Sequence, residues 1–278
     1  TSMTMLSINT NVGALTAARS SYSVNKSMET SMERLASGKR INSAADDAAN
    51  LAISTRITAE IQGLKQSIKN AADAQSLLNV TEGALSEVHT ILLRMRELAV
   101  QSSNDTVRDQ DRDMLQMEVA QLEAEIQRIS DDTTWSGMTL LAGGFTTGAT
   151  FQIGPRDTDT IQISIEAIDA TTASALALSS HVSLQANAQD YIVTIDNAIS
   201  KISEQRGKYG ATINRLDHAM ANMANIVTNL SAAKGRLEDA DYAAESANLA
   251  RTQVLQQASM AMLAQANASQ QLALSLFR

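Results

Sequence analysis

Two long heptad repeats constrain this chain more than any other feature of its sequence. Positions 57, 64, 71, 78, 85, 92 and 99 are Ile, Leu, Ala, Leu, Leu, Leu and Ala. Positions 195, 202, 209, 216, 223, 230 and 237 are Ile, Ile, Tyr, Leu, Met, Leu and Leu. An apolar residue at every seventh position is typical of helices that pack along a continuous seam. The sequence therefore predicts two very long helices, over about 44–102 and 187–234, that pair as an antiparallel coiled coil.

The scarcity of helix breakers agrees with long helices. The 278 residues include 1 Pro and 12 Gly, whereas average usage of about 5% would give about 14 prolines. This composition argues against a compact α/β enzyme with many tight loops and against an all-β sandwich. Because the chain has no cysteine, disulfides, a thiolate nucleophile and a Cys-ligated metal are excluded.

Shorter elements flank the coiled coil. Apolar residues at three- and four-residue spacing predict a helix over 4–37, and Gly38 should end it. Ser43 and Asp46 have the spacing of a capping box for the next helix. Further helices are predicted over 107–129 and, after an interruption at Gly235, over 240–278. The first helix presents one apolar stripe that contains Ile8, Val12, Leu15, Ala18 and Tyr22.

A glycine-rich segment separates the third helix from the second heptad helix. Phe151 and Ile153 alternate with polar residues before a turn at 154–159, and Ile161, Ile163 and Ile165 alternate after it. Alternation on both sides of a turn predicts a β-hairpin with one buried face. We place this hairpin near 138–166.

Charge is missing from both ends of the chain. No charged side chain occurs from Thr1 to Ala18, or over the 26 residues from Thr252 to Phe277. Neither stretch is apolar enough to span a membrane. A long uncharged helix that is too polar for lipid indicates contact with protein on several faces. We therefore expect the terminal helices to pair and then to pack between subunits, with Ile8, Val12, Leu15, Leu255, Met262, Leu263 and Leu276 as candidate packing residues.

The domain organisation follows from these elements. Residues 1–45 and 240–278 should form one terminal-helix domain, and 46–239 a long-helix bundle that carries the hairpin. The fold class is mainly α. No basic region precedes an apolar core near the N-terminus, so we expect no cleaved secretory signal.

Motifs for catalysis or cofactor binding are missing from the sequence. It contains no HExxH, P-loop or dinucleotide-binding pattern. Helix starts explain the carboxylates at 46–47 and 238–241 better than a metal site does. The net charge of −8 disfavours nucleic acid as a partner. We therefore expect no enzyme, no cofactor and no metal.

Several blocks resemble those of the bacterial flagellins. They are Ile8-Asn9-Thr10-Asn11, the LASGKRINSAADDAA block at 35–49, RELAVQ at 96–101, EDADY at 238–242, LQQA at 255–258 and LAQAN at 263–267. The resemblance covers about 6–142 and 190–278. Three features depart from the family: Trp135-Ser136-Gly137 replaces Phe-Asn-Gly, Asn50 stands where Gly is common, and the segment between Leu141 and Ala188 is too short for variable outer domains.

The resemblance implies a structural subunit that self-assembles into the flagellar filament used for motility, outside the cell. It implies that the paired terminal helices form the inner tube of the filament and the bundle the outer one. It also implies export through a type III apparatus, an export chaperone that binds about 240–278, and filament cap and hook-associated proteins as partners. An alternative is a hook–filament junction protein, and a signalling coiled coil is a more distant one that the hairpin argues against.

The resemblance further implies recognition by a Toll-like host receptor through Arg94, Leu98 and Glu118. At about 100° per residue, Arg94 and Leu98 lie on neighbouring positions of the helix, away from the predicted seam. Leu98 also fits a second apolar stripe that would pack against the 107–129 helix. The other members of this stripe are Leu77, Ala84 and Ile91. Both roles remain open for Leu98 from the sequence.

Overall fold

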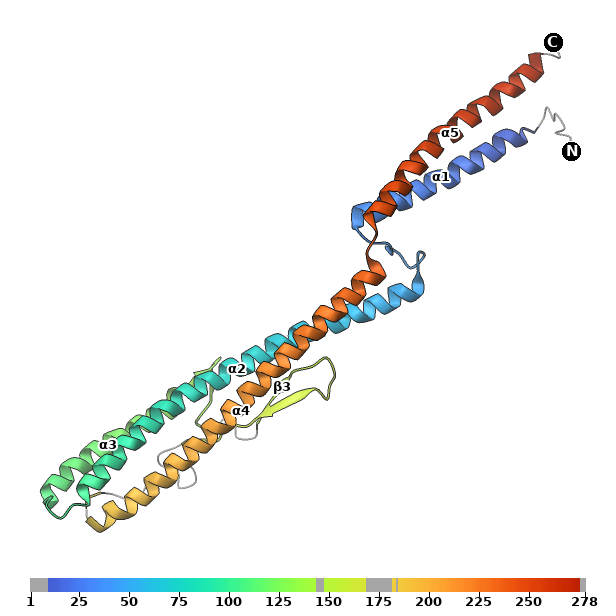
Figure 1. Ribbon diagram of the computed structural model, residues 1–278. Coiled ribbons are helices and arrows are strands. Elements are labelled where there is room, and N and C mark those ends of the chain that lie inside the picture. The colour runs from blue at the N-terminus through green and yellow to red at the C-terminus, as the bar shows by residue number, and fades with distance from the viewer. Residues whose placement is uncertain (1–9, 144–147, 169–181, 184, 276–278) are drawn as a thin grey trace. The chain divides into compact units, whose positions relative to one another are not determined.

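The structure is a computed structural model that describes residues 10–143, 148–168, 182–183 and 185–275 (Figure 1). The chain divides into two compact units. The terminal unit comprises Thr1–Ala59 with Leu230–Arg278, and the bundle unit comprises Glu60–Asn229. The boundaries expected from the sequence, at 45/46 and 239/240, follow the interhelix linkers, whereas the contacts divide the chain inside the two long helices. The fold is mainly α, as predicted.

The bundle unit is built on the two long helices, α2 (Ala48–Ser102) and α4 (Gln185–Glu238). Three polar pairs show that they run antiparallel: Arg96 with Asp196 at 2.6 Å, Arg206 with Glu82 at 2.8 Å and Gln75 with Asp217 at 2.9 Å. Eleven of the fourteen heptad positions are buried, and Ile57, Leu230 and Leu237 are half-buried. The coiled coil predicted from the repeats is therefore confirmed. The fully buried seam residues include Ala71, Leu78, Leu85, Leu92, Ala99, Ile195 and Leu216.

Helix α3 (Asp109–Asp132) lies beside the C-terminal part of α2 (Figure 1). The Arg94 guanidinium lies 2.9 Å from the Glu118 carboxylate across the two helices. Arg112 is buried and donates hydrogen bonds to the carbonyl oxygens of Ser102 at 2.8 Å and Asn104 at 3.0 Å. The first bond satisfies a carbonyl at the C-terminus of α2, where intrahelical amide donors are missing, and the second holds the turn that follows α2.

The predicted hairpin is present as β3 (Ala149–Gln152) paired antiparallel with β4 (Thr160–Ile163). Ile161 and Ile163 form its buried face. The turn after β3 packs on α2, where a Cβ added to Gly63 would lie 3.4 Å from the Cβ of Pro155. Seven residues further along α2, Asn70 donates a hydrogen bond of 3.0 Å to the Gln152 carbonyl.

A second, smaller hairpin pairs β1 (Thr134–Trp135) with β2 (Met138–Thr139) and was not predicted. Its two turn residues, Ser136 and Gly137, have φ values of 50° and 81°. Positive φ at both central residues is what a two-residue hairpin turn of type I′ requires. Ser136-Gly137 therefore forms the turn even though this chain has Trp-Ser-Gly in place of the family's Phe-Asn-Gly.

The terminal unit contains the antiparallel pair α1 (Val12–Ser37) and α5 (Tyr242–Ser275). Hydrogen bonds join Asn11 to the Ala266 carbonyl at 3.1 Å, Gln256 to Asn25 at 2.8 Å and Tyr242 to the Leu35 carbonyl at 2.8 Å. The expected pairing of the two terminal helices is therefore confirmed.

Helix α1 begins later than predicted. It starts at Val12, and the Asn11 side chain caps it by accepting the Ala14 amide at 2.9 Å; residues 4–9 of the predicted helix lie outside the described residues. The end at Gly38 is confirmed, because this residue takes a left-handed φ of 71° that favours glycine.

Helix α2 also begins later, at Ala48 rather than 44. Asp46 does not act in a capping box. Its carboxylate accepts the amides of Ser43 at 2.9 Å and Asn42 at 3.1 Å and so closes a turn. Asp47 takes the capping role by accepting the Asn50 amide at 3.0 Å.

The predicted interruption at Gly235 is wrong, because α4 continues to Glu238. A glycine in a helix interior costs only about 1 kcal/mol, which the flanking turns tolerate. The predicted third helix of 107–129 is Asp109–Asp132. None of the helices in the described ranges has the length and hydropathy needed to cross a membrane.

Candidate functional site

The face along which α1 and α5 pair consists mainly of small and polar side chains. The least exposed positions of α1 repeat at three- and four-residue spacing, and so do those of α5. Ser31 on α1 and Thr252 and Ser259 on α5 are buried there. The paired positions are Ala14, Ala17, Ser21, Val24, Met28, Ser31 and Leu35 on α1, and Glu245, Leu249, Thr252, Gln256, Ser259, Leu263 and Ala266 on α5.

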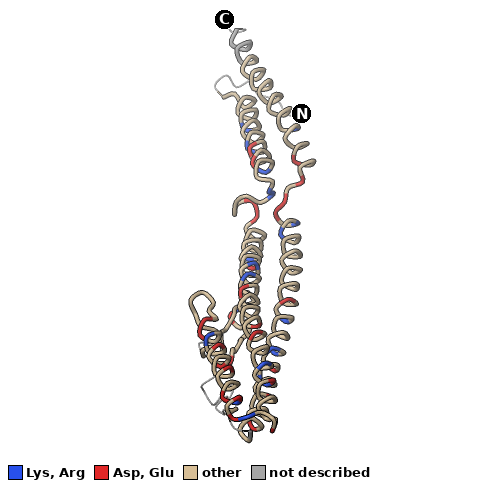
Figure 2. Tube along the Cα trace, turned by 90° about the vertical axis from the view of Figure 1, so that its left-hand side faces the viewer, with Lys and Arg blue, Asp and Glu red and all other residues tan. Residues whose placement is uncertain are grey.

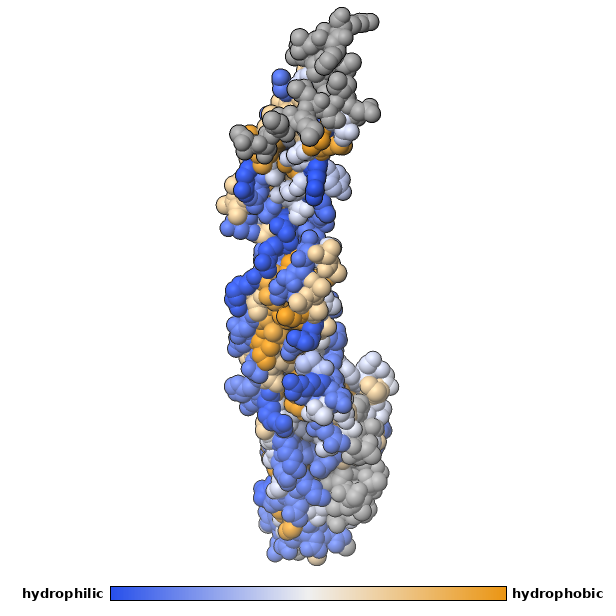
Figure 3. All heavy atoms as spheres, turned by 90° about the vertical axis from the view of Figure 1, so that its right-hand side faces the viewer, coloured by the Kyte–Doolittle hydropathy of each residue, from blue (hydrophilic) through white to orange (hydrophobic). Residues whose placement is uncertain are grey.

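Bulky apolar residues of the same two helices point away from the pairing face. Val12 and Leu15 are 65% and 63% exposed, and Met262 is 65% exposed. The stripe that we predicted along the first helix therefore faces outward over its N-terminal half. Figure 3 shows apolar side chains, in orange, that interrupt the polar surface of one face. The exposed apolar residues of the pair are Val12, Leu15, Tyr22, Met32, Tyr242, Val254, Leu255, Met260 and Met262.

The predicted packing residues thus divide into three groups. Val12, Leu15, Leu255 and Met262 are exposed on the described surface. Leu263 is half-buried on the pairing face. The remaining two, at positions 8 and 276, lie outside the described residues.

Charge also differs between the units (Figure 2). The terminal unit holds 10 Lys and Arg against 8 Asp and Glu, a net charge of +2. The bundle unit holds the other 12 Lys and Arg and 22 Asp and Glu, a net charge of −10. Bundle units of neighbouring copies must therefore repel one another at low ionic strength, whereas terminal units do so much less.

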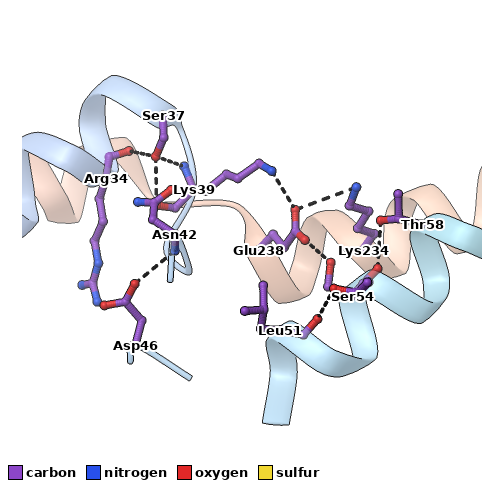
Figure 4. Close-up of polar contacts among 11 residues, drawn as sticks. Arg34, Ser37, Lys39, Asn42, Asp46, Leu51, Ser54, Thr58, Lys234 and Glu238 are labelled. Carbon is purple, nitrogen blue, oxygen red and sulfur yellow. Dashed lines mark hydrogen bonds and ion pairs between the residues drawn. The ribbon is translucent and has the colours of Figure 1, made fainter. Parts of the chain in front are cut away.

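A polar cluster joins the two interhelix linkers within the terminal unit (Figure 4). The buried Glu238 carboxylate lies 3.4 Å from the Lys39 ammonium and 3.9 Å from that of Lys234, and it accepts the Ser54 hydroxyl. The Glu238 carbonyl accepts the Arg40 amide at 2.6 Å. We predicted that Glu238 lies at a helix start, which is wrong because it is the last residue of α4. The four-residue spacing from Lys234 was the only local signal of its ion pair.

The electrostatics of this cluster favour an ionised Glu238. Burial raises the pKa of the carboxyl, but the Ser54 hydroxyl and the Lys234 and Lys39 ammoniums outweigh burial and leave the pKa below its ordinary value. Opposite charges and a donated hydrogen bond stabilise the charged form in this way. Glu238 therefore acts as a fixed negative charge between the linkers.

The candidate receptor residues lie together on α2 and α3. Arg94 is half-exposed and pairs with Glu118 and, at 3.1 Å, with Glu97. The hydrogen bonds that Arg94 donates to the carboxylates of Glu118 and then Glu97 raise its pKa. Leu98 is only 1% exposed, as its place in the second apolar stripe suggested.

We searched the described residues for side chains placed to bind a metal ion. They contain no group of three or more His, Asp or Glu side chains placed to hold a metal ion. The described surface is dominated by long helices, and the terminal pair leaves bulky apolar side chains exposed. This arrangement is typical of fibre-forming structural proteins, whose helical ends pack against further copies of the same chain.

Comparison with known proteins identifies the family within this class. Residues 8–146 match the bacterial flagellin N-terminal helical region, and residues 192–277 match the bacterial flagellin C-terminal helical region. The flagellin of Halalkalibacterium halodurans is 43% identical over 272 residues, which covers 98% of this chain and 99% of that protein. The flagellin of Bacillus subtilis is 37% identical over 302 residues with the same coverage. The chain belongs to the bacterial flagellin family.

Solved structures agree with this assignment. Bacillus cereus flagellin is similar with a TM-score of 0.50 at 34% identity, covering 60% of this chain and 94% of that one. A flagellar hook-associated protein from Vibrio parahaemolyticus gives a TM-score of 0.60 at 17% identity, covering 70% and 100%, which shows a shared fold only. The relatives therefore favour a filament subunit over the junction protein. The chain is a structural subunit of the bacterial flagellar filament, and such subunits polymerise with one another.

Proposed function

We propose that the chain polymerises through the outward apolar faces of α1 and α5. The observation that carries this proposal is the exposure of Val12, Leu15, Leu255 and Met262 beside a small and polar pairing face. Removing such side chains from water on assembly contributes about 1.5–3 kcal/mol for each one fully buried. Ile8 and Leu276 stay candidates for the same contact from the sequence alone. The terminal pair would then line the inside of the filament, with the bundle outside.

The terminal helices should gain most of their order on assembly. The most buried positions of their shared face are polar, and its leucines are only half-buried. A lone pair therefore has little apolar burial to offset the entropy of ordering two long helices. Packing against neighbouring copies would supply the missing burial.

An image of the purified protein tests the polymer directly. Salt should be added to screen the net charge of −10 on the bundle unit, because screening shortens the range of repulsion between copies. We expect long tubes by negative-stain electron microscopy. Isolated rods or globules under all salt conditions would contradict the proposal.

The family resemblance supports further partners. We infer that the chain leaves the cell unfolded through a type III apparatus, without a cleaved signal peptide. An export chaperone would bind about 240–278, a cap protein would assist folding at the growing tip, and hook-associated proteins would contact the filament end. The role is structural, without catalysis, and the polymer serves motility outside the cell.

A host Toll-like receptor is a further proposed partner. Arg94 and Glu118 are both accessible and lie 2.9 Å apart across α2 and α3, so they present one polar surface. Leu98 is buried and would hold α2 and α3 in the arrangement that presents this polar surface.

Arg94→Ala should weaken receptor signalling by the monomer and leave polymerisation and helix content unchanged. Arg96→Ala is the matched control, because Arg96 is also on α2 and accessible but pairs with Asp196 of α4. Signalling of the Arg94→Ala protein at wild-type strength, or an equal loss in both variants, would contradict the receptor site.

A further inference from the structure

Glu238 is a buried charge whose partners come from three separate segments of the terminal unit. Lys39 lies in the linker between α1 and α2, Ser54 lies early in α2, and Lys234 lies one turn before Glu238 on α4. Glu238 is 7% exposed. Burial of a carboxylate is costly unless charges and hydrogen bonds compensate it, so all three contacts contribute to keeping the side chain in place (Figure 4).

The backbone around Glu238 pairs the two linkers. The Arg40 amide donates to the Glu238 carbonyl at 2.6 Å, and the Ala240 amide donates to the Gly38 carbonyl at 3.0 Å. These bonds form a single antiparallel bridge between Lys39 and Asp239. The Arg40 guanidinium adds a bond of 3.0 Å to the Leu237 carbonyl. An isolated bridge of this kind needs side-chain support, because it has no sheet around it.

Ser54 extends the cluster into the long helix. Its side chain is fully buried and donates to the Glu238 carboxylate. Residues 48–59 of α2 and 230–238 of α4 belong to the same compact unit as the terminal helices. The contact between Ser54 and Glu238 therefore ties the start of α2 to the linkers that lead into α1 and α5.

We propose that Glu238 is a positioning residue for assembly, which joins both linkers to residues 48–59 so that these segments and the terminal helices order together. This inference rests on the proposed assembly through the terminal pair. Without Glu238 the linkers would separate, and the exposed faces of α1 and α5 would no longer be held in one arrangement.

Glu238→Gln tests the proposal, because it keeps the shape of the side chain and removes its charge. Glu245→Gln is the matched control: Glu245 is 8% exposed in the same unit, but its ion pair, with Arg34 at 3.7 Å, joins only α1 to α5. We expect Glu238→Gln to raise the critical concentration for polymerisation about tenfold, and Glu245→Gln to raise it less, because its one ion pair of 3.7 Å involves neither linker.

Hydrogen exchange of the polymer supplies the second readout. In Glu238→Gln the amides of Arg40, Ala240 and residues 48–59 should lose protection together, while the thermal midpoint of the bundle unit stays unchanged. Lys39→Met should not add to the effect of Glu238→Gln in the double variant, because both changes remove one interaction; a role in packing alone would give additive losses.

Equal critical concentrations for Glu238→Gln and Glu245→Gln would overturn the proposal. Loss of protection in the linkers without any change at 48–59 would overturn it too. If the wild-type chain forms no filaments, the proposed function is wrong instead, and the same exchange measurements on the monomer then decide the role of Glu238.

Discussion

The bundle unit and the terminal unit both pair long antiparallel helices, but the bundle buries its largest apolar side chains at the pairing face, whereas the terminal pair leaves most of its own exposed. In the bundle, Leu78, Leu85, Leu92 and Leu216 lie fully buried between α2 and α4. In the terminal pair, Ser31 and Ser259 are buried between the helices, while most of the bulky apolar residues are exposed. Heptad spacing therefore determines which face of each helix pairs. The residue types at that face determine whether one chain alone buries enough apolar surface to stabilise the pair.

The difference has an energetic consequence. A fully buried Leu contributes about 1.5–3 kcal/mol, and the bundle seam holds several of them within one chain. Ser and Thr at the terminal pairing face contribute far less, so the stability of that pair depends on other copies.

The largest expected effect follows from removing one side of the terminal pair. Deletion of residues 252–278 should abolish polymerisation, because it removes Val254, Leu255, Met260 and Met262 from the outward face. The long helices should stay folded, since their seam lies elsewhere. Circular dichroism should lose only the contribution of the deleted helix, and electron microscopy should show no filaments. Filaments formed by the truncated chain would break the comparison.

The same substitution, Leu to Ala, can be compared at buried positions of the bundle and at an exposed position of the terminal pair. Leu92→Ala or Leu216→Ala should lower the free energy of unfolding by about 2–5 kcal/mol, as buried Leu truncations do. Leu15→Ala, at an exposed position, should change it by less than about 0.5 kcal/mol and instead raise the critical concentration for assembly. Urea unfolding of the monomer measures the first effect, and light scattering measures the second. Similar losses of monomer stability in both sets would contradict the account.

Arg112 offers a smaller effect inside the bundle. Arg112→Ala removes the donor to the Ser102 carbonyl and one of the two donors to the Asn104 carbonyl, which also accepts the Val107 amide; this loss should cost about 1–3 kcal/mol. Urea unfolding should show this loss, whereas polymerisation at low temperature should continue. A stability equal to that of the wild-type protein would contradict a structural role for Arg112.

The smallest effect concerns acid. The amides of Ser43 and Asn42 lower the pKa of Asp46, and the Asn50 amide lowers that of Asp47, from ordinary values of 3.8. The pKa of Glu238 is also below its ordinary value of 4.5. A lowered pKa stabilises the folded linkers fully above the ordinary value, and the contribution disappears as pH falls through the folded value. Exchange protection of the linkers should therefore fall in acid before that of the apolar seam; simultaneous loss would contradict this order.

Much of the fold could be predicted because periodicity reports packing. The heptads of α2 and α4 predicted the bundle, and the alternation around Ile161 predicted the β3–β4 hairpin. The ends of the helices were harder to predict from the sequence. Asp46 and Asp47 are adjacent carboxylates, and only the backbone geometry decides that Asp47 caps α2. The β1–β2 hairpin escaped prediction because two residues per strand carry no alternation.

The candidate site was predictable in part. Missing charge at both ends indicated protein contacts and the pairing of the terminal helices. The apolar stripe of the first helix did not by itself show which face pairs within the chain; the structure places Leu15 outward and buries Ser31 at the pairing face. The Glu238 cluster joins residues up to 199 positions apart, such as Lys39, so no local pattern could predict it.

Hydrogen exchange of the monomer and of the filament, followed helix by helix, tests the central claim most directly. Amides of α2 and α4 within the bundle unit should be equally protected in both states, because their seam is complete in one chain. Amides of α1 and α5 should gain at least about 100-fold protection on assembly, because only neighbouring copies cover their apolar faces. Equal protection of α1 and α5 in monomer and filament would contradict the account.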